Sequence, residues 1–115
     1  MATLLFSKPN PSSGTITAPG TVSFNYTISG NDPTDVKVSY HLNSGNNVYF
    51  DEGGALVKEI RRKIRLTNPP LPVNETFKIV KHGSNPDFSL CYINIDGIDL
   101  NNNDTDHEVF TLHFV

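Results

Sequence analysis

The 115-residue chain has little charge and a single cysteine. Charged residues make up 18% of it, where about 25% is usual for a soluble domain. Because Cys91 stands alone, an intrachain disulfide is excluded. No apolar run approaches the roughly 18 residues of a membrane-spanning helix. The net charge of −3 excludes a basic face that covers a whole side of the molecule. We therefore expect one domain, residues 1–115, that binds neither membrane nor nucleic acid.

Short segments of alternating apolar and polar residues account for much of the chain. The clearest are 22–28 and 36–42, and segments 48–50, 77–79 and 110–114 follow the same period of two. Clusters of Gly, Pro, Asn and Ser separate them. This pattern predicts an all-β fold: a single antiparallel β-sandwich, immunoglobulin-like or fibronectin-like, with about seven to nine short strands.

Two segments depart from simple alternation. Residues 88–95 are apolar on both faces, which predicts a central strand covered on both sides. Residues 56–66, LVKEIRRKIRL, fit a helix with one apolar stripe, but also a strand whose inward face is interrupted by Arg62. Because short strands surround this segment, we favour a strand with a bulge or a twisted edge over a crossover helix.

Residues 94–108, NIDGIDLNNNDTDHE, hold five carboxylates and no Lys or Arg. Calcium binds six to eight oxygen ligands of the kinds found here. The run from Asp99 matches the first half of an EF-hand loop, but Asp104 replaces the required glycine and Phe110 the bidentate glutamate. An EF-hand is therefore excluded, and an irregular calcium site or a polar turn remains. The candidate ligands are Asp96, Asp99, Asn101, Asn103, Asp104 and Asp106.

Five of the nine basic residues fall within eight positions, and they are Lys58, Arg61, Arg62, Lys63 and Arg65. Such a run is typical of a surface for an acidic partner, or of an edge strand protected against aggregation. Aromatic residues that would stack on bases are absent between Gly53 and Phe77, which argues against nucleic acid. Contact between segment 58–65 of one copy and segment 94–108 of another would give a salt-dependent homo-oligomer.

Saccharide binding is a further hypothesis, based on an Asn-rich loop next to an aromatic residue. Asn46 and Asn47 could hydrogen-bond a sugar, and Tyr49 could stack on it. Catalysis has weaker support, because no nucleophile elbow, HExxH motif or phosphate-binding glycine loop occurs. Cys91 lies in an apolar segment, where a thiol is normally inert. We therefore predict that the protein is not an enzyme.

The residues together predict a non-catalytic binding module, lectin-like or calcium-assisted, that uses its Asn- and Asp-rich loops. The alternative is a structural or protein-interaction domain that uses segment 58–65. No cofactor is required, and calcium is the one candidate. The first residues lack the basic and apolar regions of a secretory signal, which predicts a cytoplasmic protein. The alternative is a secreted form from which the signal has been removed.

Overall fold

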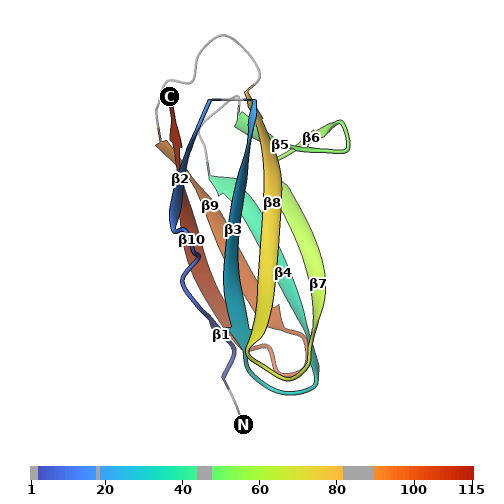
Figure 1. Ribbon diagram of the computed structural model, residues 1–115. Helices are drawn as coiled ribbons and strands as arrows, with labels where there is room; N and C mark the ends of the chain where they lie inside the picture. Colours follow the sequence, from blue (N-terminus) through green and yellow to red (C-terminus); the bar gives the residue numbers. More distant parts are fainter. Residues whose placement is uncertain (1–2, 18, 44–47, 82–89) are drawn as a thin grey trace.

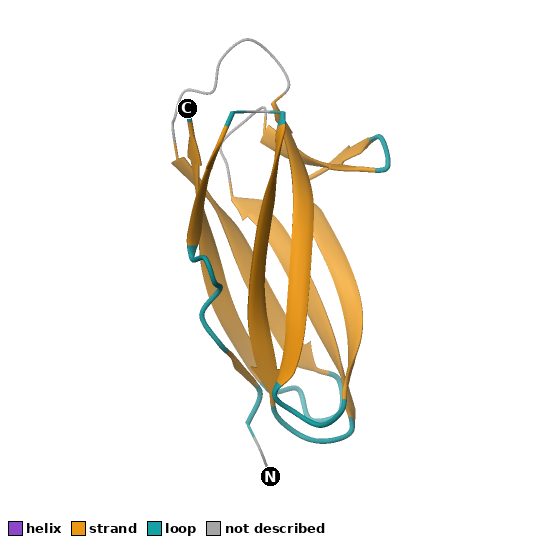
Figure 2. Ribbon diagram, in the orientation of Figure 1, coloured by secondary structure: helices purple, strands orange, loops and turns teal. Residues whose placement is uncertain are grey.

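The computed structural model describes residues 3–17, 19–43, 48–81 and 90–115 (Figure 1). Figure 2 shows strands joined by loops throughout these residues. The ten strands are β1 (Leu5–Phe6), β2 (Ser13–Ile16), β3 (Gly20–Ser29), β4 (Thr34–Asn43), β5 (Val48–Glu52), β6 (Ala55–Val57), β7 (Glu59–Leu66), β8 (Leu71–Lys81), β9 (Leu90–Asp99) and β10 (Thr105–Phe114). The described residues contain no helix long and apolar enough to cross a membrane.

The strands form two five-stranded sheets that pack face to face (Figure 1). One sheet has the order β1-β3-β8-β5-β6, and the other has the order β2-β10-β9-β4-β7. In the first sheet, the neighbouring strands β1, β3, β8 and β5 occupy the A, B, E and D positions of an immunoglobulin fold. In the second sheet, the neighbouring strands β10, β9 and β4 occupy the G, F and C positions. The predicted immunoglobulin-like β-sandwich is therefore confirmed.

Alternation of side chains along each strand builds the core between the sheets. In β3 the residues Val22, Phe24, Tyr26 and Ile28 are buried, as are Val36, Val38, Tyr40 and Leu42 in β4. Aromatic rings fill the centre, where the ring centroids of Phe24 and Phe110 lie 4.9 Å apart and those of Tyr40 and Phe77 also 4.9 Å. The period of two in segments 22–28 and 36–42 was therefore a correct guide to the buried face.

The ambiguous segment 56–66 consists of two strands, and the chain changes sheets between them. β6 pairs with β5 in one sheet, and β7 pairs with β4 at the edge of the other. Lys58 lies at the change, between the two strands. The preference for an edge strand over a helix is confirmed. Arg62 points inward with Ile60, Ile64 and Leu66, which explains the polar residue on an otherwise apolar face.

Three details of the prediction were wrong. The described residues form ten strands rather than about seven to nine, because short β1 and β2 form and segment 56–66 is divided. The sandwich is not wholly antiparallel, since β2 pairs with β10 in parallel. β9 is central in its sheet, but the described residues cover only one of its faces: Leu90 and Tyr92 are 37% and 38% exposed, because no described strand packs on the outer side.

Candidate functional site

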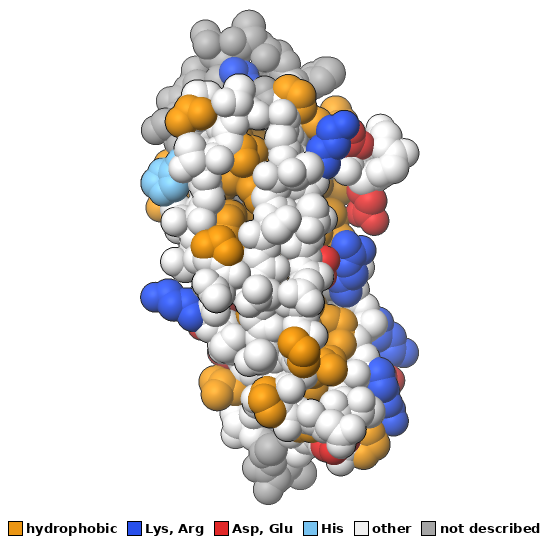
Figure 3. All heavy atoms as spheres, in the orientation of Figure 1, with side chains coloured by type: hydrophobic (Ala, Val, Ile, Leu, Met, Phe, Trp, Pro, Cys, Tyr) orange, Lys and Arg blue, Asp and Glu red, His pale blue; other side chains and the backbone are white. Residues whose placement is uncertain are grey.

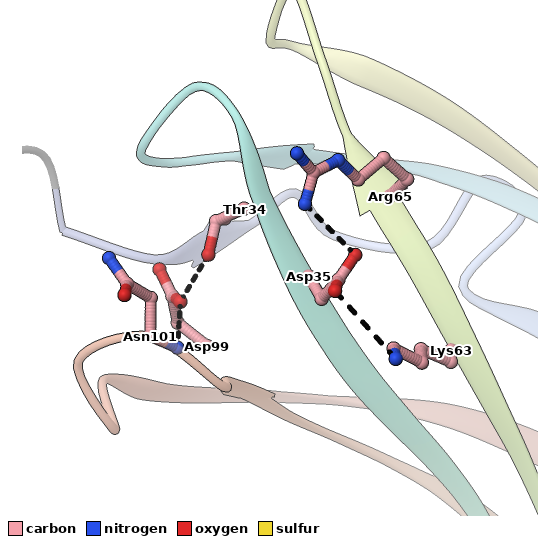
Figure 4. Close-up of polar contacts among 6 residues, drawn as sticks. All are labelled: Thr34, Asp35, Lys63, Arg65, Asp99 and Asn101. Atoms are coloured by element: carbon pink, nitrogen blue, oxygen red, sulfur yellow. Dashed lines mark hydrogen bonds and ion pairs between the residues drawn. The ribbon is translucent and has the colours of Figure 1, made fainter.

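The hairpin between β9 and β10 is organised by a buried carboxylate, Asp99. Its Oδ1 accepts hydrogen bonds from Thr34 Oγ1 at 2.6 Å and from the Asn101 amide at 2.9 Å (Figure 4). Its Oδ2 accepts from Asn31 Nδ2 at 3.4 Å. Burial by itself raises the pKa of Asp99, but these hydrogen bonds outweigh it and hold that pKa below its usual value. The side chain is fully buried, so it fixes the turn from the inside.

The other five candidate metal ligands lie on different sides of this hairpin. Asp96 is exposed on the outer face of β9, whereas the Asp106 carboxylate accepts a hydrogen bond from the Phe6 amide at 2.6 Å. Asn101 and Asn103 are exposed, and Asn103 has a φ of 65°, a left-handed conformation that suits asparagine in turns. Asp104 N donates to the side chain of Asn102 at 2.9 Å.

The structure does not bring the six candidates together as one set of ligands. Among the described residues, no group of three or more His, Cys, Asp or Glu side chains could hold a metal ion. Three of the candidate carboxylates, Asp99, Asp104 and Asp106, already accept hydrogen bonds from the protein. The geometry therefore favours the interpretation of segment 94–108 as a polar turn over its interpretation as a calcium site.

The basic segment separates into residues that face the protein and residues that face solvent. Lys58 donates to the Val48 carbonyl at 2.6 Å and lies over the Tyr49 ring, with Nζ 4.4 Å from the centroid. Burial lowers the pKa of this ammonium. Arg62 turns into the sandwich and pairs with Glu75 of β8. These two cations have structural partners, and three of the five predicted surface residues remain outside.

The three outward residues are Arg61, Lys63 and Arg65, and their side chains are 65%, 67% and 58% exposed. In register beside Lys63 lies Lys37 of β4, also exposed. We call these four residues the cationic strip. Figure 3 shows Lys and Arg side chains along the edge of the molecule that carries β7.

Two carboxylates share this surface, and both form ion pairs with the strip. Asp35 lies 3.3 Å from Arg65 and 3.7 Å from Lys63 (Figure 4), and Glu59 lies 3.2 Å from Arg61. The surface therefore has four cations and two anions, which leaves five basic and ten acidic residues for the rest of the chain. A protein of net charge −3 thus carries a local excess of +2 beside β7.

An open hollow of about 610 Å³ lies on the same outer face, next to the cationic strip. Its lining residues are Lys37, Ser39, Asp96, Gly97, Ile98, Thr105, Asp106 and His107. Register explains the grouping, because Ser39 and His107 both lie opposite Asp96 on the neighbouring strands. Sequence reasoning missed this hollow, since alternation gives the outward residues of each strand but not which strands are neighbours.

The proposed saccharide residues are only partly within the described structure. Asn46 and Asn47 lie outside the described residues. Tyr49 is half-buried in β5, and the Lys58 ammonium occupies one face of its ring. That face is not open for stacking on a sugar. The saccharide hypothesis remains a prediction.

Other candidates for chemistry are isolated. Cys91 is buried, and burial raises the pKa of its thiol to about 11, which agrees with an inert residue. His41 and His113 are exposed on outer faces, as alternation predicts. His107 points to the opposite side of β10 from Asp106 and Glu108, its neighbours in sequence.

The polar residues inside the sandwich were also missed. The hydroxyls of Tyr26 and Tyr40 lie 2.6 Å apart in the core and link β3 to β4. Burial is the main reason that the pKa of each tyrosine is raised far above its usual value. Glu75, only 9% exposed, faces Arg62 across the two sheets. The signal in the sequence that could have identified them is a side chain with a polar group, Tyr26, Tyr40 or Glu75, at an inward position of the strand.

No protein-family model and no curated protein matches the chain. Among solved structures, the apo form of a Calx CBD1 domain is similar. The two chains are 12% identical, each is covered over 98% of its length, and the TM-score is 0.41. A likeness of this size assigns no ligand and no partner to the present chain.

Proposed function

We propose that this protein is a non-catalytic binding module that recognises an acidic segment of a partner protein through the cationic strip. The observation that carries the proposal is the local excess of positive charge at the exposed edge strand of an otherwise acidic protein. Complementary charge increases the rate of encounter and orients the partner. The partner is the acidic component, because the strip would repel a basic one.

The internal ion pairs of the strip do not oppose this function. Arg61, Lys63 and Arg65 pair with carboxylates that are about a third exposed, and such surface pairs contribute about 0–1 kcal/mol each. A partner carboxylate can therefore replace Asp35 or Glu59 at small cost.

Calcium-assisted recognition by segment 94–108 has support only from its composition. Asp99 and Asp106 use their carboxylates to hold the hairpin and β1. Calcium is therefore not part of the proposed function. Its direct test is thermal unfolding with and without the ion.

The experiment measures binding of poly-L-glutamate by isothermal titration calorimetry, at about 50 mM and 500 mM salt, where screening differs strongly. We expect binding at low salt that is lost at high salt. The variant Arg61→Glu/Lys63→Glu/Arg65→Glu should not bind. A matched variant, Lys8→Glu/Lys78→Glu/Lys81→Glu, reverses the same number of charges away from the strip and should bind nearly as well as the parent protein.

Two results would overturn the proposal. One is equal loss of binding in both variants, because the net charge of the protein alone would then determine its affinity for poly-L-glutamate. The other is tighter binding of an oligothymidylate of equal length, because its phosphates and bases would then be the preferred ligand. Circular dichroism spectra of both variants establish that they are folded.

A further inference from the structure

Among the described strands that end a sheet, β7 is the longest. The strands at the ends of the two sheets are β1, β6, β2 and β7, with two, three, four and eight residues. An eight-residue strand is about 26 Å long. On the side away from β4, no described strand pairs with it. Its outward N–H and C=O groups are thus available to a further strand.

The charges of β7 determine which strand can pair there. Arg61, Lys63 and Arg65 alternate along the strand and project from one face. If two copies paired through β7, six cations would meet on that face, and like charges opposite each other are destabilising. A second copy is therefore a poor occupant. An apolar strand would leave the cations without new partners.

An acidic strand matches this arrangement in spacing as well as in charge. Strands share one pleat, so carboxylates at alternate positions of a partner lie opposite alternate positions of β7. The intervening partner residues would face inward, next to half-buried Arg62 and Ile64 at the rim of the core. Small or β-branched residues suit those positions.

We propose that β7 receives an extended segment of the partner protein as an added strand, with acidic residues at alternate positions opposite Arg61, Lys63 and Arg65. This inference rests on the proposed function and specifies how the acidic partner is recognised. Main-chain hydrogen bonds would provide affinity, and the alternating carboxylates would provide specificity.

The first experiment compares two nine-residue peptides of one composition by fluorescence anisotropy. In one peptide glutamate alternates with threonine, and in the other the glutamates form a single block. We expect the alternating peptide to bind about tenfold more tightly, because only it places every carboxylate on one face. The variant Arg61→Glu/Lys63→Glu/Arg65→Glu should lose the difference, and Lys8→Glu/Lys78→Glu/Lys81→Glu should keep it.

The second experiment tests the main-chain hydrogen bonds. In an added strand, residues of one parity direct their N–H groups toward β7, and those of the other parity direct them to solvent. One alternating peptide is N-methylated at its glutamates, and another at its threonines. We expect one of the two to lose binding about tenfold or more and the other to bind as the unmethylated peptide does.

Each alternative outcome has a distinct meaning. Equal binding of the alternating, blocked and both methylated peptides would overturn strand addition and leave the proposed function standing. Failure of every acidic peptide to bind the folded protein would overturn both. If sedimentation equilibrium shows a dimer that the triple reversal on β7 abolishes, the occupant is a second copy and the inference is wrong.

Discussion

Arg62 of β7 and Glu75 of β8 form an ion pair between the two sheets, with Nε 3.4 Å from Oε2 and Nη2 3.4 Å from Oε1. The guanidinium also lies over the Phe77 ring, 5.9 Å from its centroid. Glu75 is 9% exposed and Arg62 is 40% exposed, so the pair closes the sandwich where the core meets solvent. One of the five basic residues of the surface hypothesis thus has its partner in the other sheet.

Removal of Arg62 should destabilise the fold. Arg62→Met leaves the Glu75 carboxylate almost buried without its cation, and we expect a loss of about 2 kcal/mol, less than for a fully buried pair. Arg61→Met removes an exposed cation from the same strand and should cost about 0.5 kcal/mol or less. Urea denaturation at neutral pH measures both. Equal effects of the two substitutions would show that the pair contributes nothing beyond a surface contact.

The tyrosine pair in the core should keep its protons while the protein is folded. The pKa values of Tyr26 and Tyr40 are raised chiefly by burial, so the folded state holds these protons when the unfolded state, near pH 10, loses them. Stability from this source is complete below about pH 10 and falls as the pH rises above it.

An alkaline titration followed at 295 nm tests this directly. The double variant Tyr26→Phe/Tyr40→Phe should show the same tyrosinate absorbance as the parent protein until unfolding begins. A smaller amplitude in the folded variant would mean that one of the two hydroxyls ionises in the native state. Tyr40→Phe alone should cost about 1–2 kcal/mol, because it leaves the buried Tyr26 hydroxyl without its partner.

The contribution of Asp99 to the free energy of unfolding should decrease at acidic pH. Because its pKa is lowered on folding, the contribution is present above the unfolded value of about 4 and is lost as the pH falls through the lower folded value. Asp99→Asn should cost about 2 kcal/mol at pH 7 and less at pH 3. Denaturation at both pH values gives the difference. A cost independent of pH would show that the charge is unimportant.

Calcium should leave the melting temperature unchanged. A bound ion at a hundredfold excess over its Kd would stabilise the fold by about 2.7 kcal/mol, a shift of several degrees. The carboxylates of Asp99 and Asp106 already accept hydrogen bonds within the protein. We therefore expect the melting temperatures measured with calcium and with chelator, at one protein concentration, to agree within about 1 °C. A larger shift that Asp104→Ala removes would re-establish the metal hypothesis for this hairpin.

Gly97 should be intolerant of a side chain. A methyl group at this position would overlap the ring of Phe6, which packs on the bare backbone of β9. Gly97→Ala should therefore cost about 1–3 kcal/mol by displacing β1. In a Phe6→Ala background the same substitution should cost much less. Additive costs in a double-mutant cycle would contradict this contact.

The buried faces of the strands could be predicted from the order of the residues. In segments 22–28 and 36–42 the alternation is local, and it needs only the geometry of an extended chain to assign inward and outward residues. The same alternation agrees with the exposed positions of His41 and His113. Turn residues such as Asn and Gly marked the ends of the strands, which is also a local property.

Tertiary structure alone decided which strands are neighbours and which partners the polar residues have. Arg62 looked like an interruption in sequence, and only the approach of β8 gives it Glu75. Asp99 was predicted to be a metal ligand, but in the structure its carboxylate accepts a hydrogen bond from Thr34, 65 residues away in sequence. Strand order depends on contacts between distant segments, and a period of two contains no information about them. For that reason the basic segment and its place at an edge could be predicted from the sequence, but the hollow beside it could not.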